Sequence, residues 1–240
     1  MTDALPRLVL RRDALDEGFS DGEIGRPTRR REWIRLRRGA HLDGAAPDGA
    51  AARHRLLVSA ALGGMRRPAV VSHQSAAVLL GLPLWWVRLD QLHLTRRPPS
   101  WNDAGRTLVV HVGHLDDDEV VDVRGVLVTS PARTAVDLAG SLSSERAVVV
   151  LDAALHGGHC NAATLAEALG RCRGRPGVRS ASRAVSFADG RSESVGESRS
   201  RVVLHRLGLS PSDLQFPVHG TDGAFLGRTD SAWQPRPRHR

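Results

Sequence analysis

The apolar stretches of this 240-residue chain are short, and strands and helices fall into separate groups. Runs with strand-like alternation or β-branched residues come as a block between stretches of helical spacing. The strand-like runs are 90–95, 107–112 and 126–129. Strict alternation of strands and helices would indicate a parallel α/β sheet, whereas this grouping predicts an α+β fold.

Helix signals lie on both sides of that block. Ser72 can cap a helix that Gly81 and Pro83 end, and hydroxyls precede Pro131 at the start of another. The predicted helices cover residues 51–62, 72–80, 131–139, 144–155 and 162–171. Together these elements define an α+β middle domain over 51–182, preceded by a Gly/Ala/Pro/Asp-rich linker over 43–50.

The first 43 residues have the element order of a winged helix-turn-helix. A short apolar run ends at Leu10, and residues 11–17 can form a helix closed by Gly18. Ser20 and Glu23 have capping-box spacing and start a second helix. Trp33 to Arg37 then alternates like a strand, and a turn at Gly39 leads to the next strand. Pro27 lies inside the second helix, so we expect it either to split and restart near Thr28 or to be degenerate.

Basic residues are concentrated in this segment. Seven Arg and one Glu between positions 26 and 38 give a local net charge of +6. Guanidinium groups bind phosphates and, bidentately, the major-groove edge of guanine, so this segment is the candidate DNA-binding surface. Its residues are Arg26, Arg29, Arg30, Arg31, Arg35, Arg37 and Arg38. The alternative is a solvated charged face.

Residues 191–233 form a third segment. An amphipathic helix is predicted from Glu193 to Leu207, ended by Gly208, and 214–218 and 225–229 could pair as a hairpin. Residues 234–240 contain two Pro and no apolar residue, which predicts a disordered tail. One helix and one strand pair do not close a core, so this segment is expected to be incomplete.

Several motifs resemble AbiEi-type antitoxins. The stretches 13–24 and 31–39 are similar to the N-terminal winged helix of that family, and 71–77 and 128–139 are similar to helix starts of its middle domain. The resemblance covers about residues 1–170. It implies a DNA-binding first domain, repression of the protein's own operon, and a nucleotidyltransferase-like toxin as partner.

The third segment resembles a different family, the Vsr-like branch of PD-(D/E)XK endonucleases. The resemblance implies that Glu197 matches an acid on the first helix and Asp230 an acid of the central hairpin. The family has another acid and a basic residue on the next strand. The ten residues after Asp230 contain no Asp, Glu or Lys, so the resemblance implies a truncated domain in which both acids are vestigial. Mg²⁺ would be a cofactor only if the nuclease alternative held.

Other candidate sites have simpler interpretations. Two His and two Cys between positions 156 and 172 fit no common zinc spacing, so no metal site is predicted. Ser72 with His73, and Ser130, are interpreted as helix caps instead of nucleophiles. The acidic run 116–119 is interpreted as a solvated loop, and Trp85–Trp86 as a core or interface anchor.

Composition limits the class of protein. Two Cys exclude a disulfide-rich scaffold, and the absence of an 18-residue apolar run or a signal-peptide pattern predicts a cytoplasmic protein with no membrane contact. A formal charge of +8 favours an anionic partner. The leading hypothesis is a non-catalytic regulator that binds double-stranded DNA, possibly as a homodimer, with no cofactor. The alternatives are a Mg²⁺-dependent endonuclease and a frameshifted, inactive copy of one.

Overall fold

A computed structural model describes residues 7–30, 32–63, 65, 69–99, 103–105 and 107–233. The chain divides into two compact units, one formed by 1–79 with 88–129 and the other by 80–87 with 130–240. Both helices and mixed sheets are present, so the predicted α+β class is confirmed. The predicted domain boundaries do not coincide with the border between these units. Residue 182, the predicted end of the middle domain, falls within the helix Val178–Phe187.

The first unit begins with a small helix and strand assembly. Its elements are β1 (Arg7–Leu10), α1 (Arg11–Asp16), α2 (Asp21–Arg29), β2 (Trp33–Arg37) and β3 (Ala40–Asp43). The strands form an antiparallel sheet in the order β1-β3-β2. Buried side chains, Ala14, Ile24, Ala40 and Leu42, fill the space between the sheet and the two helices. This agrees with the predicted order of elements.

The predicted capping box at the start of α2 is confirmed. The Ser20 hydroxyl accepts a hydrogen bond from the Glu23 backbone N–H, and the Glu23 carboxylate accepts one from the Ser20 backbone N–H. The Ser20 hydroxyl also donates to the Glu23 carboxylate, and this bond, followed by the one from the Ser20 N–H, holds the pKa of Glu23 below its ordinary value. The expected split at Pro27 is wrong, because α2 runs unbroken to Arg29 with Pro27 inside it. Only two helical residues follow Pro27, and the missing N–H removes a single helical hydrogen bond, the one from position 27 to the Glu23 carbonyl.

The rest of the first unit is built on a six-stranded mixed sheet. Its order is β6-β7-β5-β4-β9-β8, with β5–β7 and β4–β9 parallel and the other pairs antiparallel. The strands are β4 (Val70–Val71), β5 (Leu92–Arg96), β6 (Asp103–Ala104), β7 (Leu108–Val112), β8 (Val120–Val123) and β9 (Val126–Thr129). The 3-10 helix η1 (Asp117–Glu119) precedes β8. The acidic run is not fully solvated, since Glu119 is buried and its carboxylate accepts from the Asp116 N–H.

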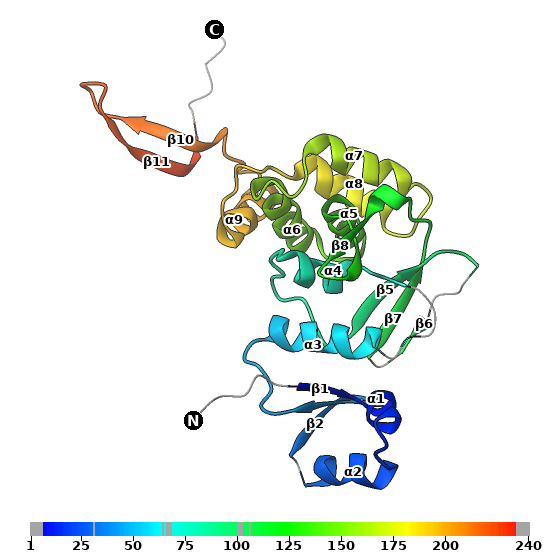
Figure 1. Cartoon of the computed structure of the whole chain (residues 1–240). Coiled ribbons are helices and arrows are strands. Elements are labelled where there is room, and N and C mark those ends of the chain that lie inside the picture. Colours follow the sequence, from blue (N-terminus) through cyan, green and yellow to red (C-terminus); the bar gives the residue numbers. More distant parts are fainter. Residues whose placement is uncertain are drawn as a thin grey trace. The chain divides into compact units, whose positions relative to one another are not determined.

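Two helices pack with these strands. The helix α3 (Ala50–Leu62) contacts the small sheet and β5, and α4 (His73–Leu80) begins directly after the buried Ser72 (Figure 1). A buried polar network joins α3, α4 and β5. His54 donates through Nδ1 to the Leu89 carbonyl, and its Nε2 lies 2.8 Å from the Ser75 hydroxyl oxygen. That same oxygen accepts from the backbone N–H of His93 at 2.8 Å.

The second unit is helical with a hairpin. Its elements are α5 (Pro131–Ser141), α6 (Ser144–His156), α7 (Ala162–Arg171), α8 (Val178–Phe187), α9 (Val195–Arg206), β10 (Asp213–His219) and β11 (Phe225–Ala232). The hairpin β10–β11 and the helices other than α8 match the predicted elements; α8 was not predicted. At Gly140 and Gly177 the backbones of α5 and the start of α8 touch, so a side chain at Gly177 would collide with Gly140.

A buried ion pair links α6 to α9. Arg201 Nη1 lies 2.7 Å from an oxygen of Asp152, whose side chain has no exposed surface. The second Asp152 oxygen accepts from the backbone N–H of Asp189. Burial raises the pKa of Asp152 above its ordinary value, so the carboxylate depends on these donors to stay ionised.

The Ser75 hydroxyl bonds both His54 and His93, so we expect its removal to lower the stability of the protein. Ser75→Ala leaves both His54 Nε2 and the His93 N–H buried without their partner, and should lower the free energy of unfolding by about 2 kcal/mol. Ser59→Ala is the matched control, because its hydroxyl is exposed and donates to the Arg55 carbonyl of the same helix. Equal effects of the two substitutions in urea unfolding would contradict this network.

Candidate nucleic-acid interface and histidine cluster

The arginine-rich segment presents its charges from two neighbouring elements. Arg26, Arg29 and Arg30 are exposed on α2 and its C-cap. Arg29 and Arg30 lie three and four residues after Arg26, so both neighbour it on the helix surface. A Cβ at Gly25 would lie 3.4 Å from Nη1 of Arg29, which shows that Gly25 leaves room for this guanidinium to fold over the helix.

The remaining arginines belong to the hairpin formed by β2 and β3. Arg35 pairs with His41 across the sheet, and Arg37 pairs with Ala40 after an irregularity in register. Arg38 is exposed in the turn, at which Gly39 adopts a φ of 77°. Burial and then the charge of Arg35 lower the pKa of His41, so this imidazole is neutral at pH 7. Arg31 lies outside the described residues.

Few carboxylates neutralise this surface. Of the six arginines that the structure describes there, Arg30 is the one within ion-pair distance of a described carboxylate, at 3.9 Å from Glu32. Asp21 at the start of α2 is occupied by Arg11, which donates two hydrogen bonds to it at 2.8 and 2.7 Å. The hydrogen bonds from Arg11 lower the pKa of Asp21, and the guanidinium charge neutralises this carboxylate at the start of α2. The arginines therefore remain available for an anionic ligand.

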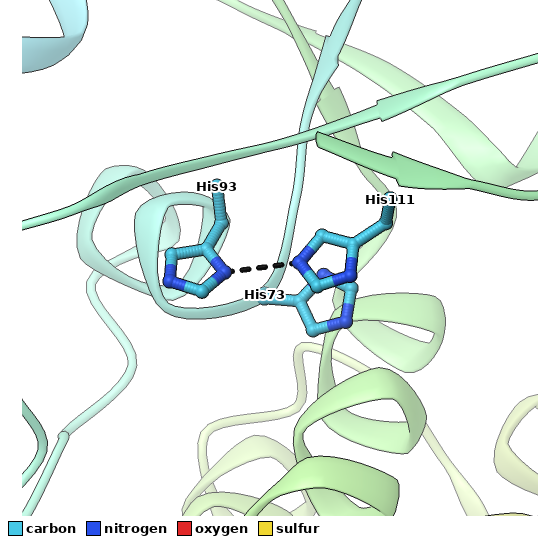
Figure 2. Close-up of side chains that lie close together, drawn as sticks. All are labelled: His73, His93 and His111. Carbon is cyan, nitrogen blue, oxygen red and sulfur yellow. Dashed lines mark hydrogen bonds between the residues drawn. The ribbon is translucent and has the colours of Figure 1, made fainter. Parts of the chain in front are cut away.

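A second cluster, not predicted from the sequence, gathers three histidines: His73, His93 and His111 (Figure 2). Nδ1 of His93 lies 3.0 Å from Nε2 of His111, and the rings of His73 and His111 are stacked with centroids 3.7 Å apart. One ligand nitrogen from each ring lies within 4.8 Å of the other two. We refer to these three residues as the histidine cluster.

Burial lowers the pKa of two members of the histidine cluster, His93 and His111. His73 and His93 are each 9% exposed and His111 is half-buried. Desolvation, followed by the neighbouring His111, lowers the pKa of His93 to about 4, and desolvation also lowers the pKa of His111. The His93 and His111 rings are therefore neutral at pH 7, and a neutral imidazole offers one nitrogen lone pair.

The other sequence candidates do not converge into a site. His156 Nδ1 lies 3.1 Å from the Gly190 carbonyl oxygen, and burial raises the pKa of the Cys160 thiol to about 11. Trp85–Trp86 was interpreted as a core or interface anchor, and the core interpretation is wrong for Trp86, which is 78% exposed. The guanidinium carbon of Arg199 lies over the Trp85 ring, 3.8 Å from the centroid of that ring.

Glu197 and Asp230 line the same recess of the second unit, together with Arg191 and Arg201. Glu197 is not a free acid: its oxygens accept from the Ser194 hydroxyl at 2.7 Å, from the Gln215 side-chain amide at 2.8 Å and from the backbone N–H of Glu193. No further carboxylate lines this recess among the described residues. These contacts make Glu197 a structural group that joins α9 to β10.

Comparison with known proteins relates the centre of the chain to one family. Residues 93–186, from β5 to α8, match the family described as AbiEi antitoxin C-terminal domain. This match supports the resemblance to AbiEi-type antitoxins and relates the segment to toxin–antitoxin systems. The resemblance of the first 43 residues stays a prediction, and the endonuclease resemblance finds no support.

Two relatives come from Mycobacterium tuberculosis. The uncharacterized proteins MT2308 and Rv2248 are each 43% identical to this chain over 111 residues, which is 46% of this chain and 41% of the relative. The matched region therefore spans less than half the length of those relatives. The crystal structure of the RV2827C protein from the same organism aligns with 88% of this chain and 79% of its own at 17% identity and a TM-score of 0.49, a level that supports no conclusion. Across the described ranges, no helix is long and apolar enough to cross a membrane.

The low pKa of His93 predicts that the protein, once a chelator has removed any bound metal ion, loses folding stability in acid. In the unfolded chain His93 takes up a proton near its ordinary pKa, whereas the folded protein excludes that proton down to about pH 4. Stability is therefore complete above about pH 6.5 and declines as the pH falls toward 4, with a loss from His93 alone of about 1 kcal/mol between about pH 7.5 and pH 5.5. Urea unfolding at the two pH values measures this loss. His93→Gln should show a smaller pH dependence, and an unchanged dependence would contradict the assignment.

Proposed function

We propose that this chain is a DNA-binding transcription regulator of a toxin–antitoxin system, similar to AbiEi-type antitoxins. The observation that carries the proposal is the arginine surface on α2 and the β2–β3 hairpin, in the same chain as a segment that matches an antitoxin family. The proposed activity is binding alone, with no bond made or broken.

The local topology fits a winged helix-turn-helix. The helices α1 and α2 are separated by four residues that include Gly18 at a φ of 93°, as in helix-turn-helix motifs. In such motifs the second helix enters the major groove, and here that helix is α2. The β2–β3 hairpin would be the wing, with Arg35 and Arg38 reaching the phosphate backbone or the minor groove.

The roles of the arginines follow from their placement. Arg26 and Arg29 on the exposed face of α2 would contact phosphates or guanine edges, and Arg30 at its C-cap would contact phosphates, as would Arg31, the next residue in the sequence. The unbroken α2 supports this proposal, because a helix interrupted at Pro27 would separate Arg26 from Arg29. A homodimer on inverted-repeat DNA and a nucleotidyltransferase-like toxin as partner complete the proposal. Both come from the resemblance to AbiEi-type antitoxins.

A titration of DNA binding tests the proposal. The probe is a duplex from the region upstream of the protein's own gene, measured by gel shift at several salt concentrations. Arg26→Ala/Arg29→Ala should weaken binding about tenfold or more and should reduce the slope of log K against log salt by about 2, since two phosphate contacts are lost.

The matched control is Arg179→Ala/Arg183→Ala, which removes the same charge from exposed positions of α8 in the other unit. It should leave affinity and salt slope close to those of the unsubstituted protein. Equal losses in both double variants would show a nonspecific charge effect and would overturn the assigned interface, as would the absence of binding at low salt.

A further inference from the structure

Three imidazole side chains converge in the first unit from elements that are distant in sequence. His93 and His111 lie on β5 and β7, which pair in parallel with His93 opposite Val109 and Thr95 opposite His111. Residues two apart on a strand share a face, so both histidines point to the same side of the sheet. His73 is the first residue of α4 and reaches the same side with a φ of 52° (Figure 2).

We propose that the histidine cluster is a binding site for a divalent transition-metal ion of the zinc type, held by one nitrogen each of His73, His93 and His111. A three-imidazole set with no carboxylate suits Zn²⁺, Co²⁺, Ni²⁺ or Cu²⁺ and does not suit Mg²⁺ or Ca²⁺, which require oxygen ligands. Three protein ligands leave a fourth tetrahedral position for water.

The distances suit such an ion. Nitrogens that bind zinc tetrahedrally at about 2.0–2.1 Å lie about 3.4 Å apart. The Nδ1 of His93 and the Nε2 of His111 are 3.0 Å apart. These two nitrogens therefore need to move apart by only a few tenths of an ångström to bind the ion. His73 must turn out of its stacking contact with His111, because an imidazole binds a metal in the plane of its ring. With its Nδ1 held 3.0 Å from the Ser72 hydroxyl oxygen, His73 would bind through Nε2.

A buried polar atom beside the histidines supports the site independently. The Thr95 side chain lies on the same face of β5 as His93 and opposite His111, and the residue is only 2% exposed. Its hydroxyl oxygen has no hydrogen-bond partner among the residues that the structure describes. Buried hydroxyls are normally bonded, and a metal-bound water would supply the missing partner. His111 is half-buried, so the cluster keeps some contact with solvent.

Metal binding is tested on the full-length, chelator-treated protein by calorimetric titration with Zn²⁺ and by the visible absorption of Co²⁺. The expected result is one ion per chain with micromolar or tighter affinity, a tetrahedral Co²⁺ spectrum, and a melting temperature about 5 °C or more higher at saturating Zn²⁺. No stoichiometric binding by the unsubstituted protein would overturn the proposal, whatever the variants do.

Variants then locate the ion. His93→Ala and His111→Ala, checked for folding by circular dichroism, should weaken Zn²⁺ binding at least tenfold, whereas Thr95→Val should weaken it less. The control is His114→Ala, an exposed histidine of the same unit that should bind Zn²⁺ normally. Unchanged binding in folded His93→Ala and His111→Ala, or its loss in a folded variant of Cys160 and His159, would place the ion elsewhere and overturn the proposal.

Discussion

The parallel pairing of β5 with β7 is the constraint on which the first unit depends. It places His93, Thr95 and His111 on one face, while Leu92, Leu94 and Val110 alternate with them. The backbone of β5 is itself fixed by the Ser75 hydroxyl, which also bonds His54 of α3. Since α3 contacts both β5 and the small N-terminal sheet, the same helix that stabilises the larger sheet supports the arginine-bearing hairpin.

Local interactions determine how the arginines are presented. The Ser20–Glu23 capping box starts α2, and the pair Arg11–Asp21 joins the two short helices and neutralises an acid in the first turn of α2. These contacts leave the exposed guanidinium groups of α2 and the hairpin with few carboxylates nearby. A surface of this kind has its effect through long-range attraction and phosphate contacts, so its strength depends on salt.

The sequence predicted local elements better than their assembly. The capping box at Ser20, the hydroxyl before Pro131 and the short spacing between 214–218 and 225–229 are local signals, and the corresponding helices and hairpin are present. The unit border and the histidine cluster depend on pairing between segments far apart, which one sequence does not reveal. A His on each of two neighbouring strand-like runs was the available signal, but strand register decides whether they meet. The predicted split of the second helix at Pro27 was wrong, because Pro27 lies near the end of α2, where it has little effect on the helix.

Amide hydrogen exchange of the full-length protein with and without the upstream duplex measures the central claim most directly. The account predicts added protection in residues 20–43, across α2 and the β2–β3 hairpin, that disappears at high salt. Protection confined to α9 and the β10–β11 hairpin, or no change anywhere at a saturating concentration of duplex, would contradict it.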